Sequence, residues 1–380
     1  MNFVLILEWL IKGLVLVLVL LGGFAYLTLV ERRVLGRIQV RIGPNRAGPQ
    51  GILQPIADAI KLIFKEELTP AQSDKLIFTL APVLTVVPAL VITAVVPWGP
   101  TLDLFGYKLT LYIADINVGV LYIMSVASIA VYGIVMAGWS SNNKYAMMGG
   151  MRSSAQMISY EIALGLSFVS AILLAGSMRM MDIVETQRSL WFAVLQPVGA
   201  AIFLIATLAE VNRAPFDMPE AEQELTAGYH TEYSGMKFAL LFMAEYDKMI
   251  AISAIGATLF FGGYREPWFM TRLLPVLSVD HTPWLGPFYI LLKIAILLFG
   301  MIWVRATFPR IRYDRLMAFG WKVLLPLSLA IVFITATGII LAEQVNPLFI
   351  WGIPVVSLAA GLFAVAMIER TLRRKDYARH

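Results

Sequence analysis

The feature that most constrains this chain is a series of long apolar segments without Lys, Arg, Asp or Glu. As a helix, each can cross a hydrocarbon layer about 30 Å thick, which takes roughly 20 residues. Of the 380 residues only 14% are charged, whereas soluble domains carry about 25%. The sequence therefore predicts an all-α polytopic membrane protein. The uncharged segments are 13–30, 76–102, 116–143, 189–209, 323–342 and 344–368.

The apolar pattern predicts nine membrane-spanning helices. The sixth and seventh are interrupted by charge, at Glu245, Asp247 and Lys248 and at Lys293. The predicted spans are 3–30, 76–97, 112–138, 158–178, 190–210, 237–262, 287–307, 322–343 and 346–368.

The distribution of basic residues predicts the orientation of these spans. Most of the 30 Lys and Arg residues lie in the loops after spans one, three, five and seven and in the C-terminal tail. Cytoplasmic loops carry an excess of Lys and Arg. We therefore expect a bacterial inner-membrane protein with its N-terminus outside and its C-terminus in the cytoplasm. The net charge of +5 is explained by this asymmetry and does not indicate a nucleic-acid partner.

Several cofactor sites are excluded by what the sequence lacks. The chain has no cysteine, which excludes disulfides, thiolate-bound iron–sulfur clusters and a cysteine nucleophile. It also has no Gly-x-Gly triplet and no phosphate-binding loop motif, so the common nucleotide fingerprints are missing. We expect no redox cofactor and no metal to be bound by this chain itself.

The first cytoplasmic loop is long and basic. Gly43-Pro44, Gly48-Pro49 and Gly51 mark turns that stop a helix from continuing. Isoleucines then recur at helical spacing between residues 52 and 63, which predicts an amphipathic helix lying in the membrane interface. Contact with anionic lipid headgroups explains the basic residues as well as a catalytic role does.

Three carboxylates lie within or at the ends of predicted spans, namely Glu161, Glu210 and Glu245. Ionisable groups in membrane helices are costly to bury and mark functional sites more often than not. Positioned carboxyl groups can take up and release protons, so a proton relay is the functional hypothesis. The alternative is that each pairs with a neighbouring Arg or Lys for packing alone.

The fifth loop holds a dense acidic group close to Arg213. Carboxylates so near one another titrate as a coupled set. A solvated acidic loop is one alternative, and a divalent metal site with His230 is another, although no compact metal-binding spacing is present. These residues favour proton or ion movement but do not separate a transporter from a subunit of a redox enzyme. The acidic residues are Asp217, Glu220, Glu222 and Glu224.

Several longer strings resemble the quinone-chamber membrane subunit of the complex I family, the proton-pumping NADH:quinone oxidoreductases. The resemblance is strongest in the first loop, from Glu31 to Gly51 and from Gln54 to Glu66. It extends over about residues 8–343. The other matching strings are 138–145, 152–161, 209–225 and 228–235.

The resemblance implies roles for individual residues. It places one group near the quinone chamber or its entrance: Glu31, Arg32, Arg33, Asp58 and Lys61. It places a second group on an acidic path that links quinone reduction to proton transfer: Glu161, Glu210, Arg213, Glu220, Glu222, Glu224 and Glu245.

The resemblance also implies partners. Quinone is the expected substrate, while NADH, FMN and the iron–sulfur clusters belong to other subunits. The expected neighbours are the hydrophilic quinone-site subunits, the small membrane subunits and membrane lipids. A related membrane anchor of a hydrogenase-type complex is one alternative. An independent ion transporter is another, but the repeat symmetry or paired broken spans typical of transporters are not visible.

Two departures from the family pattern stand out. Residues 1–343 correspond to an eight-span core, so residues 344–380 add a ninth span and a basic cytoplasmic tail. The family usually continues with Ala-Asn where this chain has Asp247-Lys248. On a helix, Lys248 can reach Glu245 three residues earlier. We therefore expect these two to pair, and Asp247 to find a partner in another helix or loop.

Overall fold

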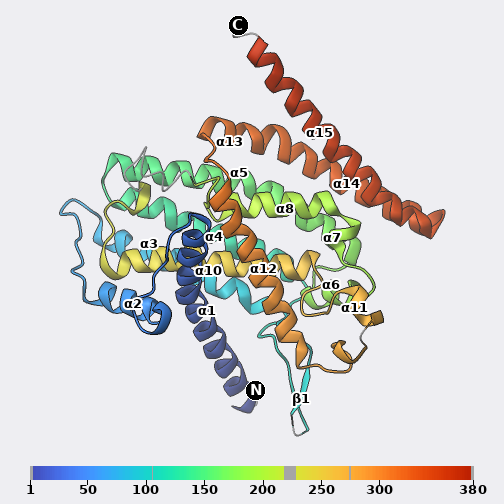
Figure 1. Cartoon of the computed structure of the whole chain (residues 1–380), viewed down its shortest axis with the longest axis horizontal. Coiled ribbons are helices and arrows are strands. Elements are labelled where there is room, and N and C mark those ends of the chain that lie inside the picture. The colour runs from blue at the N-terminus through green and yellow to red at the C-terminus, as the bar shows by residue number, and fades with distance from the viewer. Residues whose placement is uncertain (1–2, 105, 218–227, 274, 378–380) are drawn as a thin grey trace.

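The computed structural model describes residues 3–104, 106–217, 228–273 and 275–377. Their regular structure is almost entirely helical (Figure 1). The first half contains α1 (Phe3–Ile38), η1 (Pro49–Gly51), α2 (Gln54–Phe64), α3 (Lys75–Val91), η2 (Ile92–Val95), α4 (Gly119–Ser140), α5 (Lys144–Ala175) and α6 (Met180–Thr186). The second half contains α7 (Phe192–Leu195), α8 (Pro197–Glu210), η3 (Gly228–His230), α10 (Gly235–Phe260), α11 (Trp268–Leu273), η4 (Pro275–Leu277), α12 (Leu285–Thr307), α13 (Tyr313–Phe319), η5 (Gly320–Leu324), α14 (Leu325–Gln344), η6 (Pro347–Trp351) and α15 (Gly352–Tyr377).

The predicted all-α polytopic class is confirmed. In the described part of the chain, 7 helices are long and apolar enough to cross a membrane. The two remaining predicted spans correspond to α8 and α10. α8 has only 14 residues, because Pro197 lacks an N–H donor and begins a new helix after α7. α10 has 26 residues but carries Glu245, Asp247 and Lys248 in its apolar stretch.

Several helix ends differ from the predicted spans. α1 continues to Ile38, so Glu31, Arg32 and Arg33 lie on the helix and not in the loop. α5 begins at Lys144, where the Asn143 side chain caps the helix by accepting a hydrogen bond from the Tyr145 N–H at 2.9 Å. Charged residues mark the edge of the hydrocarbon layer, but a helix can continue beyond that edge.

α4 begins later than predicted, at Gly119. Part of the connection before it forms a small antiparallel hairpin of β1 (Leu102–Leu104) and β2 (Tyr107–Leu109), in which Leu102 lies opposite Leu109. The hairpin projects from the helical body in Figure 1.

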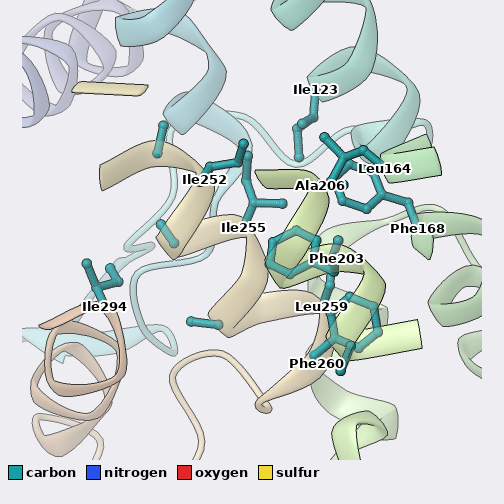
Figure 2. Packing of buried hydrophobic residues seen from close by; sticks show 14 of the residues in the cluster. Ile123, Leu164, Phe168, Phe203, Ala206, Ile252, Ile255, Leu259, Phe260 and Ile294 are labelled. Atoms are coloured by element: carbon teal, nitrogen blue, oxygen red, sulfur yellow. The ribbon is translucent and has the colours of Figure 1, made fainter. Parts of the chain in front are cut away.

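Small residues bring α3, α4 and α5 close together. A Cβ atom at Gly133 would lie 2.6 Å from the Thr85 side chain of α3, and one at Gly138 would lie 2.7 Å from the Ala146 carbonyl oxygen of α5. Glycine at such positions lets helix backbones approach within a membrane. In the main core, Phe203 of α8 meets Leu259 and Phe260 of α10 (Figure 2).

The two predicted accessory helices are both present. α2 is helical, and Ile56, Ile60 and Ile63 on it are exposed, as expected for an amphipathic helix whose apolar side faces lipid. α15 packs against α14 and α8, and its C-terminal end projects from the helical body (Figure 1). Large side chains along it, such as Val355 and Leu362, are exposed.

Candidate functional site

Arg213 is the centre of a buried ionic cluster. Its Nη1 donates to Glu31 Oε1 at 3.1 Å, and its Nε lies 2.6 Å from Glu245 Oε1. The guanidinium also lies over the Tyr246 ring, 4.3 Å from the centroid. Arg305 of α12 forms a second ion pair with Glu31. The cluster thus joins α1, α10, α12 and the loop after α8, and Glu31 and Arg213 are both buried.

The loop that carries Arg213 is fixed by α5. Gln156 of α5 donates from its side-chain amide to the carbonyl oxygens of Ala209 at 2.9 Å and Phe216 at 2.7 Å. Asn212 donates to Ser153 Oγ at 3.0 Å. Because a buried amide that satisfies two carbonyls is costly to remove, these bonds set the position of Arg213.

Lys248 pairs with Glu210, and the predicted pair with Glu245 is wrong. Its Nζ lies 2.6 Å from Glu210 Oε1 and donates to the Glu210 carbonyl oxygen at 3.1 Å. α10 turns Lys248 toward the C-terminal end of α8, where the last carbonyls attract a cation. Glu245 is bound instead by Arg213.

Asp247 lies on a different side of α10 and is fully buried. Neither of its carboxylate oxygens has a hydrogen-bond partner among the described residues. The partner that we expected from another helix or loop is therefore not found in that part of the chain.

Glu161 faces α4 from α5. It accepts a hydrogen bond from Ser128 Oγ, a residue that the sequence does not single out. Serine is common in apolar helices, so only the contact itself marks this one.

Two pockets meet at the Glu210–Lys248 pair, which lines both of them together with Thr85 and Ala130. One, of about 30 Å³, continues between apolar side chains such as Ile123 and Phe168. The other, of about 40 Å³, also reaches Glu245, Asn212 and Tyr229. Acidic side chains from α8 and α10 thus share one small polar space.

The predicted entrance group divides into two parts. Glu31 points into the buried cluster, whereas Arg32 binds Asp58 of α2 at 2.8 Å. Lys61 lies 3.5 Å from the same carboxylate, and Gln54 donates to it at 3.1 Å. Partial burial by itself would raise the pKa of Asp58, but the hydrogen bond and charge of Arg32, helped by Gln54 and Lys61, lower it below its usual range.

Arg33 lies two residues after Glu31 on α1, where Gly43 packs against it. Its Nη2 is shielded from solvent and has no hydrogen-bond partner among the described residues. Of the predicted entrance residues, Arg33 therefore retains a donor that no described group uses.

The acidic fifth loop is described only in part. Asp217 is buried and pairs with Arg310 at 2.9 Å, while Glu220, Glu222 and Glu224 lie outside the described residues. His230 is buried against the rings of Tyr229 and Phe238, and burial lowers its pKa to about 3. No group of three His, Asp or Glu suited to a metal ion occurs in the described ranges.

Comparison with known proteins identifies the family. The profile described as NADH dehydrogenase matches residues 11–336. One of the NADH-quinone oxidoreductase H subunits of Geobacter metallireducens is 48% identical over 87% of this chain and 95% of its own length. The chain belongs to the family of NADH-quinone oxidoreductase H subunits.

Relatives from other bacteria support this membership. The H subunit of Thermomicrobium roseum is 51% identical over 83% of this chain and 92% of its own length. The H subunit of Deinococcus deserti is 48% identical over 96% of this chain and 91% of its own length. These relatives do not favour the hydrogenase-type alternative, and the chain is an integral membrane protein of the H-subunit family.

Proposed function

We propose that this chain forms part of the quinone-binding chamber of a complex I type NADH-quinone oxidoreductase. We further propose that it couples quinone reduction to proton translocation through buried acidic residues. The observation that carries the proposal is the ionic cluster of Glu31, Arg213, Glu245 and Arg305. It connects Glu31, in the last two turns of α1 before the first loop, with Glu245 of α10. A change of charge at one end of the cluster is felt at the other because low-dielectric surroundings screen it weakly.

The quinone end of the site is assigned to the first loop and its surroundings. Arg33 offers a shielded donor that no described group uses, and the Arg32–Asp58 pair ties α2 to the last turns of α1. With Lys61 on the exposed side of α2, these residues suit an entrance where a headgroup passes from the membrane interface toward the chamber.

The relay end is assigned to Glu245, Glu210 and Glu161. Glu245 and Glu210 line the same pocket, and that pocket of about 40 Å³ has room for water, since about 10–15 Å³ of such space takes one molecule. Carboxyl groups joined through water can pass protons along a chain. We assign Glu220, Glu222 and Glu224 of the fifth loop to the same path on their sequence pattern.

The partners follow from the same assignment. We propose that hydrophilic quinone-site subunits cover the cytoplasmic loops and that small membrane subunits adjoin the helices. Quinone is the substrate, and NADH, FMN and the iron–sulfur clusters are held by partner subunits. The absence of cysteine and of nucleotide-binding motifs supports this division.

Purification of the native complex tests the proposal. A C-terminal affinity tag on this chain should recover an assembly that contains flavin and iron–sulfur subunits and reduces quinone with NADH. In proteoliposomes, the assembly should move protons across the membrane in step with quinone reduction, which a pH indicator inside the vesicles would record. Recovery with hydrogenase subunits, or as a homomer that transports ions without NADH, would contradict the proposal.

We also propose that the C-terminus lies in the cytoplasm and the N-terminus outside. The excess of Lys and Arg in the odd-numbered loops and the tail supports this orientation. In inside-out membrane vesicles, protease should remove the C-terminal tag completely, while right-side-out spheroplasts should protect it. The opposite pattern would overturn the orientation without affecting the family assignment.

A further inference from the structure

Lys248 occupies a distinctive position in the acidic region. Its ammonium group binds both the side chain and the carbonyl oxygen of Glu210. The pair lines both of the pockets described above. A single cation is therefore shared by the two spaces.

The two pockets differ in chemistry on either side of the pair. The pocket shared with Glu245 is lined by Asn212 and Tyr229 as well. The other is walled mainly by apolar side chains, several of which Figure 2 shows. These wall residues are Ile123, Leu164, Phe168, Ile252 and Ile255. Both pockets have room for at least one water molecule by volume.

We propose that Lys248 is a movable cationic barrier in the proton path. Its ammonium group moves from Glu210 to Glu245 when Glu210 takes up a proton. The proposal rests on the proposed function and deepens it, because it names the residue that controls passage between the two pockets. Lys248 is thus a positioning residue for the relay and does not touch quinone.

The barrier follows from the charge of the ammonium group. An excess proton in water is repelled by a fixed cation in a weakly screened space, so the Lys248–Glu210 pair separates the pockets while both partners are charged. When Glu210 becomes neutral, it no longer offsets the charge on Lys248. The other carboxylate on the same pocket is Glu245, which lies one turn earlier on α10 and on a neighbouring face.

The neighbouring charges allow this exchange. Arg213 holds Glu31 as well as Glu245, so it keeps a counter-charge if Glu245 turns toward Lys248. Arg305 also remains bound to Glu31. Glu161 of α5 remains bonded to Ser128. The exchange moves one proton onto Glu210 and one ammonium group between carboxylates, and no covalent bond other than the O–H bond forms or breaks.

The test uses the purified complex in proteoliposomes, with Lys248→Met as the main variant. Methionine keeps most of the length of the side chain but removes the charge. NADH-driven quinone reduction should continue, whereas the number of protons moved per quinone should fall below that of the wild type. Lys248→Arg keeps the cation and should restore the ratio. A ratio equal to the wild type in Lys248→Met would overturn the proposal.

Lys12→Met serves as the matched control. Like Lys248, Lys12 lies in an apolar helix and pairs with a glutamate. Its partner is Glu8, one turn earlier on the same helix, with Nζ 2.5 Å from Glu8 Oε1. Lys12 lines neither pocket. Its replacement should leave the proton ratio unchanged, and an equal fall there would also overturn the proposal.

The outcomes separate this proposal from the assigned function. A wild-type complex without NADH-driven quinone reduction contradicts the function itself. If Lys248→Met does not assemble, Lys248→Gln provides a second neutral variant that can still donate to Glu210, and it should show the same low ratio. If neither neutral variant assembles while Lys248→Arg does, the lysine is purely structural and the barrier is refuted.

Discussion

Replacing Arg213 with methionine should strongly destabilise the protein. The variant removes the guanidinium group that binds both Glu245 and Glu31. Removing one partner of a buried ion pair costs about 3–5 kcal/mol, because the other charge stays buried without compensation. We expect a large loss of assembled complex on native gels, and a lower unfolding temperature for what remains.

Arg188→Met is the appropriate comparison. Arg188 also pairs with a carboxylate, that of Asp280, but 64% of the arginine side chain and 38% of the aspartate side chain are exposed. Exposed pairs contribute about 0–1 kcal/mol, so this variant should assemble nearly as well as the wild type. Equal effects of the two substitutions would show that the Arg213 cluster does not hold the helices together. Adding Glu245→Gln to Arg213→Met should recover part of the loss, since it removes the buried charge that Arg213 had offset.

Replacing Glu161 with glutamine should abolish most turnover while leaving assembly intact. Glutamine has nearly the same size and can still accept the hydrogen bond from Ser128, but it cannot carry a proton. Positioned proton-transfer groups contribute about 10²–10⁴-fold to enzyme rates, so NADH-driven quinone reduction should fall by about 10²-fold. Quinone reduction and proton uptake should be measured on complex normalised by its flavin content.

Ser128→Ala separates the carboxyl group from its hydrogen bond. That variant keeps Glu161 titratable and removes only the donor, so we expect a much smaller loss than for Glu161→Gln. If Glu161→Gln retains the turnover and pumping of the wild type, Glu161 serves packing alone. If both variants lose activity equally, the α4–α5 contact and not the proton is what matters.

Some of the site could be predicted from the sequence, and some could not. Glu161, Glu210, Glu245 and Arg213 were identified because charge in or beside an apolar helix is conspicuous along the chain. Arg305 was missed, since an arginine at the end of a span resembles an ordinary orientation signal. Ser128 was missed because serine is unremarkable there. Lys248 was found, but its partner was predicted wrongly from helical spacing alone.

The sequence by itself determined that the chain is an all-α membrane protein and the family to which it belongs. Both depend on local quantities, the length and composition of apolar runs and the order of residues in the matching strings. The tertiary structure alone decided which charges meet. Arg213 and Glu31 are 182 residues apart, and Lys248 and Glu210 are 38 apart. Such pairs form only when the rotation and depth of two helices bring their faces together, and helix packing sets both.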